Sequence, residues 1–476
     1  MRFHPKTPCL ALLIACAAHS LAAAPVADKD HFAPFYTVGQ PLDGLPERDR
    51  QLGPFIELAK MPGRNEQALR PFYAAAQDEN TATSWKASMY PLFSIREYPG
   101  GHRWNVLELL VGAKAESSSG EPITSLELWP LFWHYDTGVP EESYDAIFPL
   151  AGTLRNRLFH KRIDWFMFPA FVRAEQPGRI DTSILWPIFR HRRGEGESGF
   201  AVWPLFGHFE GEGKYDNTYA LWPLLYDNRR TIPESKGGGE YRSAGALPFY
   251  TKETAPGMKS ESYLWPFFGY TKEEAPRKSY SEIRYLYPFW VRGSGEVKSV
   301  NRWLPFHAHE TRPGYAKTWY AWPLLKLEES RVEAMDIHKE TFLYFLYKNE
   351  VQTAPGRDFK ARKTQLWPLF GYSDDGEGSR QFMLLNPFEP LISGNEMIRQ
   401  TWTPFFAIYR YESTPQSARH SVLWDLFLYE RDSQRKEFSI GPLFESRRSD
   451  EEEGWTVLKG LVGRDKEGWN ALWGLF

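Results

Sequence analysis

Short apolar runs recur along the chain at intervals of about nineteen residues, and most of them are centred on a proline. Two examples are Leu185-Trp186-Pro187-Ile188-Phe189 and Leu264-Trp265-Pro266-Phe267-Phe268. Twenty-four such units follow one another between Pro34 and Gly474, and nineteen of them have proline at the centre. Self-similarity at a fixed period is typical of repeat architectures, so the repeat decides the fold class.

Each unit also carries one cluster of turn-forming residues, such as Arg193–Gly196 or Glu210–Gly213. The ten to fourteen residues between clusters are rich in Trp, Tyr, Phe, Thr and Val, a composition typical of β-strands. One turn per unit predicts one strand per unit. The sequence therefore predicts an all-β protein in which about 24 strands form an antiparallel meander, with the apolar runs side by side at mid-height.

Within an apolar run, both faces of the expected strand are apolar over five residues, as in Tyr263–Phe268. Such a sheet must close on itself, stack or face lipid, so we expect it to be closed or strongly curved into a barrel-like structure. A central proline donates no ladder hydrogen bond, which predicts a bulge or bend in each strand. A β-propeller or a solenoid is the alternative architecture.

The amino terminus has the pattern of a secretory signal: Arg2 and Lys6, an apolar stretch, and a small-residue segment ending near Ala22. Cleavage would remove residues 1–22. A bacterial lipoprotein box at Leu13–Cys16 offers the alternative, in which residues 1–15 are removed and Cys16 is acylated. Either way, we expect a short tether over 23–30 and one continuous β-repeat domain over 31–476.

Composition narrows the chemistry that the chain can support. The formal net charge is -3, with basic and acidic residues interspersed, which argues against a nucleic-acid partner. Both cysteines precede residue 17, so the body has neither a disulfide nor a thiolate nucleophile. We identify no catalytic, cofactor-binding or metal-binding motif.

Four histidines lie four residues after their unit centres, namely His134, His191, His208 and His309. In a solenoid they would stack into a ladder that could bind metal. With one strand per unit, a meander would instead place His191 and His208 at opposite ends of the sheet. We therefore expect solvated strand ends.

Four polar residues interrupt the apolar pattern: His307, Asn386, Glu389 and Asp425. Buried polar groups are costly unless they are partnered, so a cluster of them would mark a site. Because they are spread over three units, we expect local hydrogen bonding or solvent access to account for them.

These observations predict an exported, non-enzymatic cell-envelope protein that acts as a scaffold or binding surface, in the periplasm or outer membrane of a Gram-negative bacterium. Its partner would be an envelope protein, a lipid or a polysaccharide, which leaves membrane association open. An outer-membrane β-barrel for transport or secretion is one alternative. A carbohydrate-binding protein that uses exposed aromatic residues is another.

Overall fold

The computed structural model describes residues 31–38, 42–117, 120–388, 394–449, 453–466, 468–473 and 475. Its strands form one antiparallel sheet that runs from β1 (His31–Phe32) to β45 (Trp469–Ala471), and each strand pairs with its neighbours in sequence. The expected all-β meander is confirmed. The signal segment and Cys16 lie outside the described residues.

Most repeats contribute two strands rather than one, so the sheet has 45 strands where about 24 were expected. In one unit, β17 (Arg179–Ile184) and β18 (Phe189–Gly194) flank the proline-centred run, and the glycine-containing cluster leads into β19 (Glu197–Val202). The apolar run is therefore a turn, and the expected bulged proline at mid-strand is wrong. A turn suits proline, which has no N–H to donate to a sheet.

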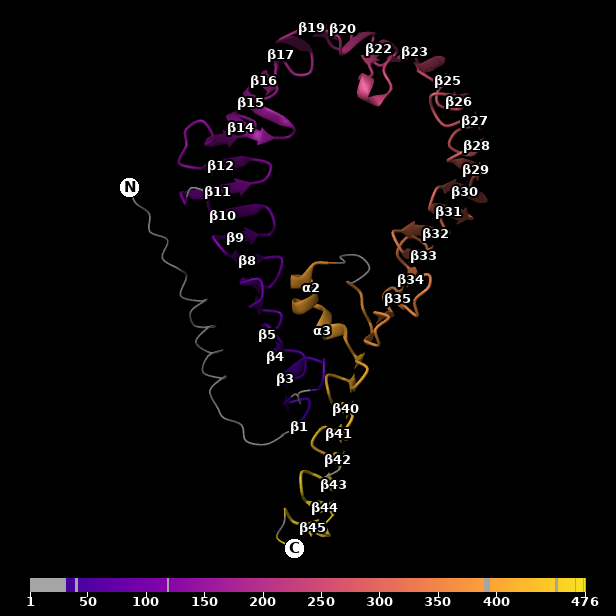
Figure 1. Ribbon diagram of the computed structural model, residues 1–476. Coiled ribbons are helices and arrows are strands. Elements are labelled where there is room, and N and C mark those ends of the chain that lie inside the picture. The colour runs from indigo at the N-terminus through magenta and orange to yellow at the C-terminus, as the bar shows by residue number, and fades with distance from the viewer. Residues whose placement is uncertain are drawn as a thin grey trace.

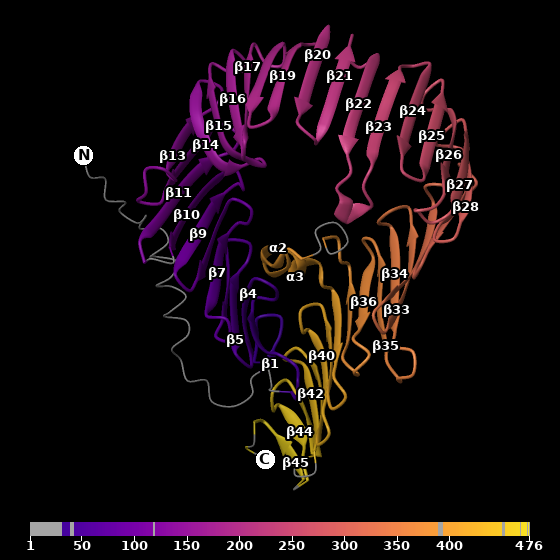
Figure 2. The ribbon, with the colours of Figure 1, turned by 45° about the horizontal axis from the view of Figure 1, so that its top comes forward.

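The sheet curves into a ring, which closes where its first strands lie beside strands from the last part of the chain (Figure 1). In the described residues β1 pairs with β2 alone and β45 with β44 alone. The first strands of the sheet instead lie beside the strands that come shortly before β41 (Arg435–Ile440) in the sequence (Figure 2). The strands from β41 onward extend beyond the ring. Closure therefore depends on side-chain contacts.

Most of the ring is a single layer with both faces open to water. The accessible surface is 29817 Å², whereas a compact protein of this mass would expose about 18,000 Å². Ion pairs across the strands cover the faces: Asp181 accepts hydrogen bonds from Arg190 and Arg192, and the Arg192 guanidinium lies 4.8 Å from the ring centre of Phe209. Cross-strand pairs of this kind stabilise a sheet that has little core.

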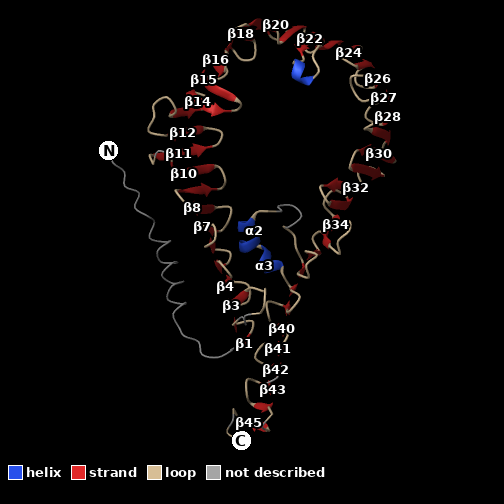
Figure 3. Ribbon diagram, viewed as in Figure 1, coloured by secondary structure: helices blue, strands red, loops and turns tan. Residues whose placement is uncertain are grey.

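A second layer exists where the ring closes. Two short helices, α2 (Glu396–Thr401) and α3 (Thr403–Phe406), lie inside the curve of the sheet (Figure 3). They belong to an insertion in one apolar turn, between β37 (Arg380–Leu384) and β38 (Tyr409–Ser413). Helix α2 contacts β6 (Tyr73–Asp78), so the insertion bridges the two ends of the ring.

Candidate functional site

All of the described proline-centred turns lie along one long edge of the sheet, which we call the apolar edge. The topology requires this arrangement: in an antiparallel meander, alternate turns fall on opposite edges, and each unit has one apolar turn and one polar turn. The repeat period of the sequence thus separates two kinds of turn onto two edges.

The apolar turns are linked into a continuous row by backbone hydrogen bonds. Within one turn, the Ile188 amide donates to the Leu185 carbonyl at 2.8 Å, around a cis Trp186–Pro187 bond. The Trp186 amide donates to the Pro169 carbonyl of the preceding turn at 2.7 Å. The same link recurs farther along the edge, where the Trp222 amide donates to the Pro204 carbonyl at 2.6 Å.

Large apolar side chains on this edge remain exposed. Trp186, Trp222 and Trp265 are each 48–50% exposed, and Leu and Phe neighbours in the same turns are exposed to a similar degree. Adjacent rings contact one another along the row: the Phe168 ring centre lies 5.1 Å from that of Phe148 and 5.6 Å from that of Trp186. The apolar edge is therefore a long, continuous aromatic strip that faces solvent. Apolar residues that are exposed singly are normal on a protein surface, but a continuous strip of them indicates an interaction surface.

The opposite edge is polar. Its turns are built around glycines with positive φ, such as Gly178, Gly196 and Gly213, with Glu, Lys and Pro beside them. The most apolar turn on this edge is that of Leu158 and Phe159, which are 68% and 100% exposed. The two edges therefore differ strongly in their affinity for water.

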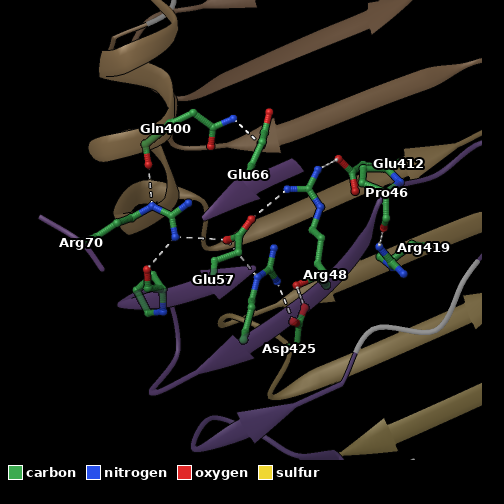
Figure 4. A network of polar contacts seen from close by, with 12 residues as sticks. Pro46, Arg48, Glu57, Glu66, Arg70, Gln400, Glu412, Arg419 and Asp425 are labelled. Carbon is green, nitrogen blue, oxygen red and sulfur yellow. Dashed lines mark hydrogen bonds and ion pairs between the residues drawn. The ribbon is translucent and has the colours of Figure 1, made fainter. Parts of the chain in front are cut away.

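The second distinctive region is a buried cluster of charges at the ring closure, which we call the junction (Figure 4). It joins β3 (Glu47–Gln51), β4 (Ile56–Met61) and β5 (Arg64–Leu69) to β38, β39 (Ala418–Val422) and β40 (Phe427–Arg431). Arg48 donates to Glu57 and to Glu412, both at 3.1 Å. Because Arg48 and Glu412 come from opposite ends of the chain, this pair closes the ring.

Glu57 is the centre of the N-terminal half of the junction. Its carboxylate accepts hydrogen bonds from Arg48, Arg50 and Arg70, and Arg70 is only 1% exposed. Burial alone would raise the pKa of Glu57, but the three guanidinium groups hold it well below its usual range. Glu57 therefore stays ionised and neutralises much of the buried positive charge.

Asp425 lies in the same junction, at the position where the repeat normally has proline. Its carboxylate accepts a 2.6 Å hydrogen bond from Arg50 and a short one from the Ser421 hydroxyl. Burial opposes ionisation, but Arg50 and Ser421 keep the pKa of Asp425 below its usual value. The backbone carbonyl of Asp425 also lies 3.0 Å from the His31 ring.

Helix α2 packs on a face of small side chains beside the charged cluster. Ala68, Ala74, Ala76 and Ala87 are buried there together with Trp85. Small side chains let the helix approach the sheet closely, and Met397 fills the space between them.

Polar contacts fix the two ends of α2. The Asn395 side chain accepts from the Ile398 amide and donates to the Tyr90 hydroxyl at 2.9 Å, while Arg70 donates to the Gln400 carbonyl at 2.6 Å. The insertion is thus held on both sides of the closure.

The structure separates the polar residues that the sequence singled out. Asn386 and Asp425 are both buried near the ring closure, at 5% and 4% exposure. His307 lies far from them in the sheet, where its ring contacts those of His309 and Tyr320. Glu389 lies outside the described residues.

The histidine series is arranged differently from our expectation. Because each unit has two strands, successive units run in the same direction, and His191 and His208 lie at the same height, both opposite Phe200. The expectation that they lie at opposite ends is wrong. His208 and His309 each contact a threonine hydroxyl at 2.8 Å. Among the described residues no group of three or more His, Cys, Asp or Glu side chains is arranged to hold a metal ion.

No protein-family model matches the sequence, and no curated protein matches it either. Within the described ranges, no helix is both long enough and apolar enough to cross a membrane.

Proposed function

We propose that this protein is a non-enzymatic scaffold of the bacterial cell envelope that lies on a lipid surface, with its apolar edge in the interfacial layer of the bilayer. The observation that carries the proposal is the apolar edge itself. Tryptophan, leucine and phenylalanine side chains are exposed in one turn after another along this edge, while the opposite edge is polar.

Lipid suits this edge better than a protein partner does. A row of some twenty turns would require a protein partner with a matching apolar surface along its whole length, whereas a membrane offers such a surface everywhere. Tryptophan and tyrosine favour the membrane–water interface, where the ring is in the apolar layer and the N–H or O–H group remains near water. The export pattern at the amino terminus supports an envelope location.

The arrangement of polar and apolar residues supports docking at the surface over crossing the bilayer. Strands of the ring, such as β18 and β21 (Tyr215–Ala220), are six residues long, and their central residues are polar. A strand that crosses the bilayer needs ~9–11 residues with an apolar outer face. Here the apolar residues are confined to one end of each strand, so that end alone would enter the lipid.

Replacing three edge tryptophans is expected to abolish vesicle binding. In Trp186→Ser/Trp222→Ser/Trp265→Ser, each change removes on the order of 100 Å² of exposed aromatic surface, or about 2–3 kcal/mol of transfer free energy. We expect a loss of at least about a hundredfold in partitioning onto phosphatidylethanolamine/phosphatidylglycerol vesicles, measured by flotation.

The matched control removes exposed apolar residues away from the apolar edge. Leu158→Ser/Phe159→Ser/Phe200→Ser should bind vesicles as well as the wild type does. Quenching of tryptophan fluorescence by brominated lipids tests the same contact without any substitution. The proposal fails if the wild type neither floats nor is quenched, or if both triple variants lose binding equally.

A further inference from the structure

The strand residues next to the apolar turns form a second apolar feature, on one face of the sheet. Ile184 pairs with Phe189 and Phe189 with Val202, and directly opposed residues in antiparallel strands have side chains on the same face. The row continues strand by strand to β26 (Phe268–Glu273). Its members over this stretch are Ile184, Phe189, Val202, Phe206, Ala220, Leu225, Ala246, Tyr250, Tyr263 and Phe268.

The position of α2 shows which face of the sheet carries this row. Helix α2 lies inside the ring and packs against a cluster that includes Ala87 (Figure 3). Directly opposed residues can be followed from Ala87 across the strands to Ser183 and Arg190, so these two residues are on the inner face. Ile184 and Phe189 are their neighbours in sequence, and successive side chains in a strand point to opposite faces. The row is therefore on the outer face of the ring, and we call it the outer band.

The large side chains of the outer band are exposed. Ile184 is 56% exposed, and Phe189, Phe206, Leu225 and Tyr263 are each 42–47% exposed. The band begins where the apolar turns end, so the band and the apolar edge form one continuous apolar surface. This surface extends from the turns onto the outer wall of the ring.

The inner face differs in composition over the same strands. Its first row above the turns consists of Ser183, Arg190, Ala201, Gly207, Tyr219, Tyr226, Gly245, Thr251, Ser262 and Gly269. Most of these residues are small or polar. The two tyrosines pack against glycines of neighbouring strands, Tyr219 against Gly207 and Tyr226 against Gly245. The apolar surface therefore ends at the turns on the inside of the ring and continues along the wall on the outside.

The outer band is also shallow. The next outward-facing residues in three of its strands are His191, Asp227 and Lys252, whose side chains are polar or charged. Two residues of a strand span about 7 Å, and amphipathic helices on a membrane bury their apolar face about 5–10 Å deep. The depth of the band matches the interfacial layer of a bilayer.

We propose that the acyl chains of lipid around the ring cover the outer band, so that the outer wall enters the leaflet more deeply than the inner wall. This inference rests on the proposed docking of the apolar edge to lipid, because the band is continuous with that edge. It specifies the partner further, as the lipid that surrounds the ring. A second copy of the chain fits the band poorly, since two convex walls touch only along a narrow line, whereas lipid follows the whole circumference.

Fluorescent labels on neighbouring residues test which wall enters the lipid. Leu225→Cys and Tyr226→Cys, in β22 (Leu225–Thr231), place a nitrobenzoxadiazole label on the outer and inner face, respectively, of a chain that also carries Cys9→Ser and Cys16→Ser. On phosphatidylethanolamine/phosphatidylglycerol vesicles, we expect brominated lipids to quench the outer label at least about threefold more strongly than the inner label.

A second pair repeats the comparison in β33 (Met335–Phe342). The inner row continues by direct pairing from Gly269 to Thr341, so Phe342 is on the outer face, where it is 38% exposed. Phe342→Cys should be quenched more strongly than Thr341→Cys. Agreement between the two pairs shows that the difference belongs to the wall and not to one strand.

Three results would overturn the inference, and each is distinct. If the wild type does not float with vesicles, the proposed docking fails and the inference fails with it. If the labelled proteins float but the inner labels are quenched as strongly as the outer ones, the docking stands and the assignment of the outer wall is wrong. If the outer labels respond to protein concentration without vesicles, a second copy covers the band instead of lipid.

Substitutions provide a test without labels. Ile184→Ser/Phe206→Ser/Leu225→Ser leaves the tryptophans of the apolar edge in place and should lower partitioning onto vesicles by about tenfold or more. Tyr219→Ser/Tyr226→Ser removes aromatic surface from the inner wall and should change partitioning by less than about twofold. Circular dichroism would show that both variants keep the β-sheet. Equal losses in the two variants would contradict the assignment.

Discussion

Glu57→Gln is expected to open the ring. The substitution removes the carboxylate that Arg48, Arg50 and Arg70 share and leaves three buried guanidinium groups repelling one another. Removing one partner of a buried charge cluster costs about 3–5 kcal/mol, so we expect the free energy of unfolding of the junction to fall by that amount. Chemical denaturation, with amide hydrogen exchange in β3 to β5, would measure it.

An exposed ion pair supplies the control for this experiment. Lys272 and Glu274 are both more than 60% exposed, and Glu274→Gln should change stability by less than about 0.5 kcal/mol. Opening can also be followed as a distance, with spin labels at Lys60→Cys and Lys436→Cys in a chain carrying Cys9→Ser and Cys16→Ser. Glu57→Gln should broaden that distance distribution, and an unchanged distribution together with unchanged stability would show that the network does not close the ring.

Acid is expected to open the same junction in the unmodified chain. Glu57, Glu412 and Asp425 have pKa values below their ordinary ones, because the arginines around them outweigh the cost of burial. Their stabilising contribution is complete above the ordinary values of 4.5 and 3.8, and it is lost as the pH falls through the lower folded values. Stability should therefore decline steadily below about pH 4.5.

One carboxylate in the junction acts in the opposite direction. Burial raises the pKa of Glu430 although it accepts a hydrogen bond from Arg419, so protonation of Glu430 slightly offsets the loss. The label distances and the free energy of unfolding, measured between pH 7 and pH 3, should change together. In Glu57→Gln, the decrease in the free energy of unfolding between pH 7 and pH 3 should be smaller than in the wild type. An equal pH dependence in both proteins would contradict this account.

The repeat predicted the fold class but not the position of the apolar run. We assigned the run to mid-strand because each unit showed one cluster of turn-forming residues and was therefore given one strand, and proline then required a bulge. The nineteen-residue period in fact accommodates two six-residue strands and two turns, as in β17 to β19. The difficulty of proline in a strand was the signal that the run is a turn.

The junction could be predicted only in part. Asp425 is visible in the sequence because it replaces a repeated proline, but its partner Arg50 has no unusual spacing, and the two are 375 residues apart. Which faces of a long sheet meet depends on curvature accumulated over many strands, which no local pattern contains. Arg48 and Glu57 were missed for the same reason.

Closure through side chains frees the circumference of the ring from the rule that governs a hydrogen-bonded cylinder. When a sheet closes by backbone pairing, strand number and stagger together fix its diameter. Here the junction involves a few strands near each end of the chain, and the sheet between them is a series of equivalent two-strand modules. Adding or deleting one two-strand module would change the perimeter by about 10 Å without altering the residues of the junction. Rings of different diameter could therefore be closed by the same junction.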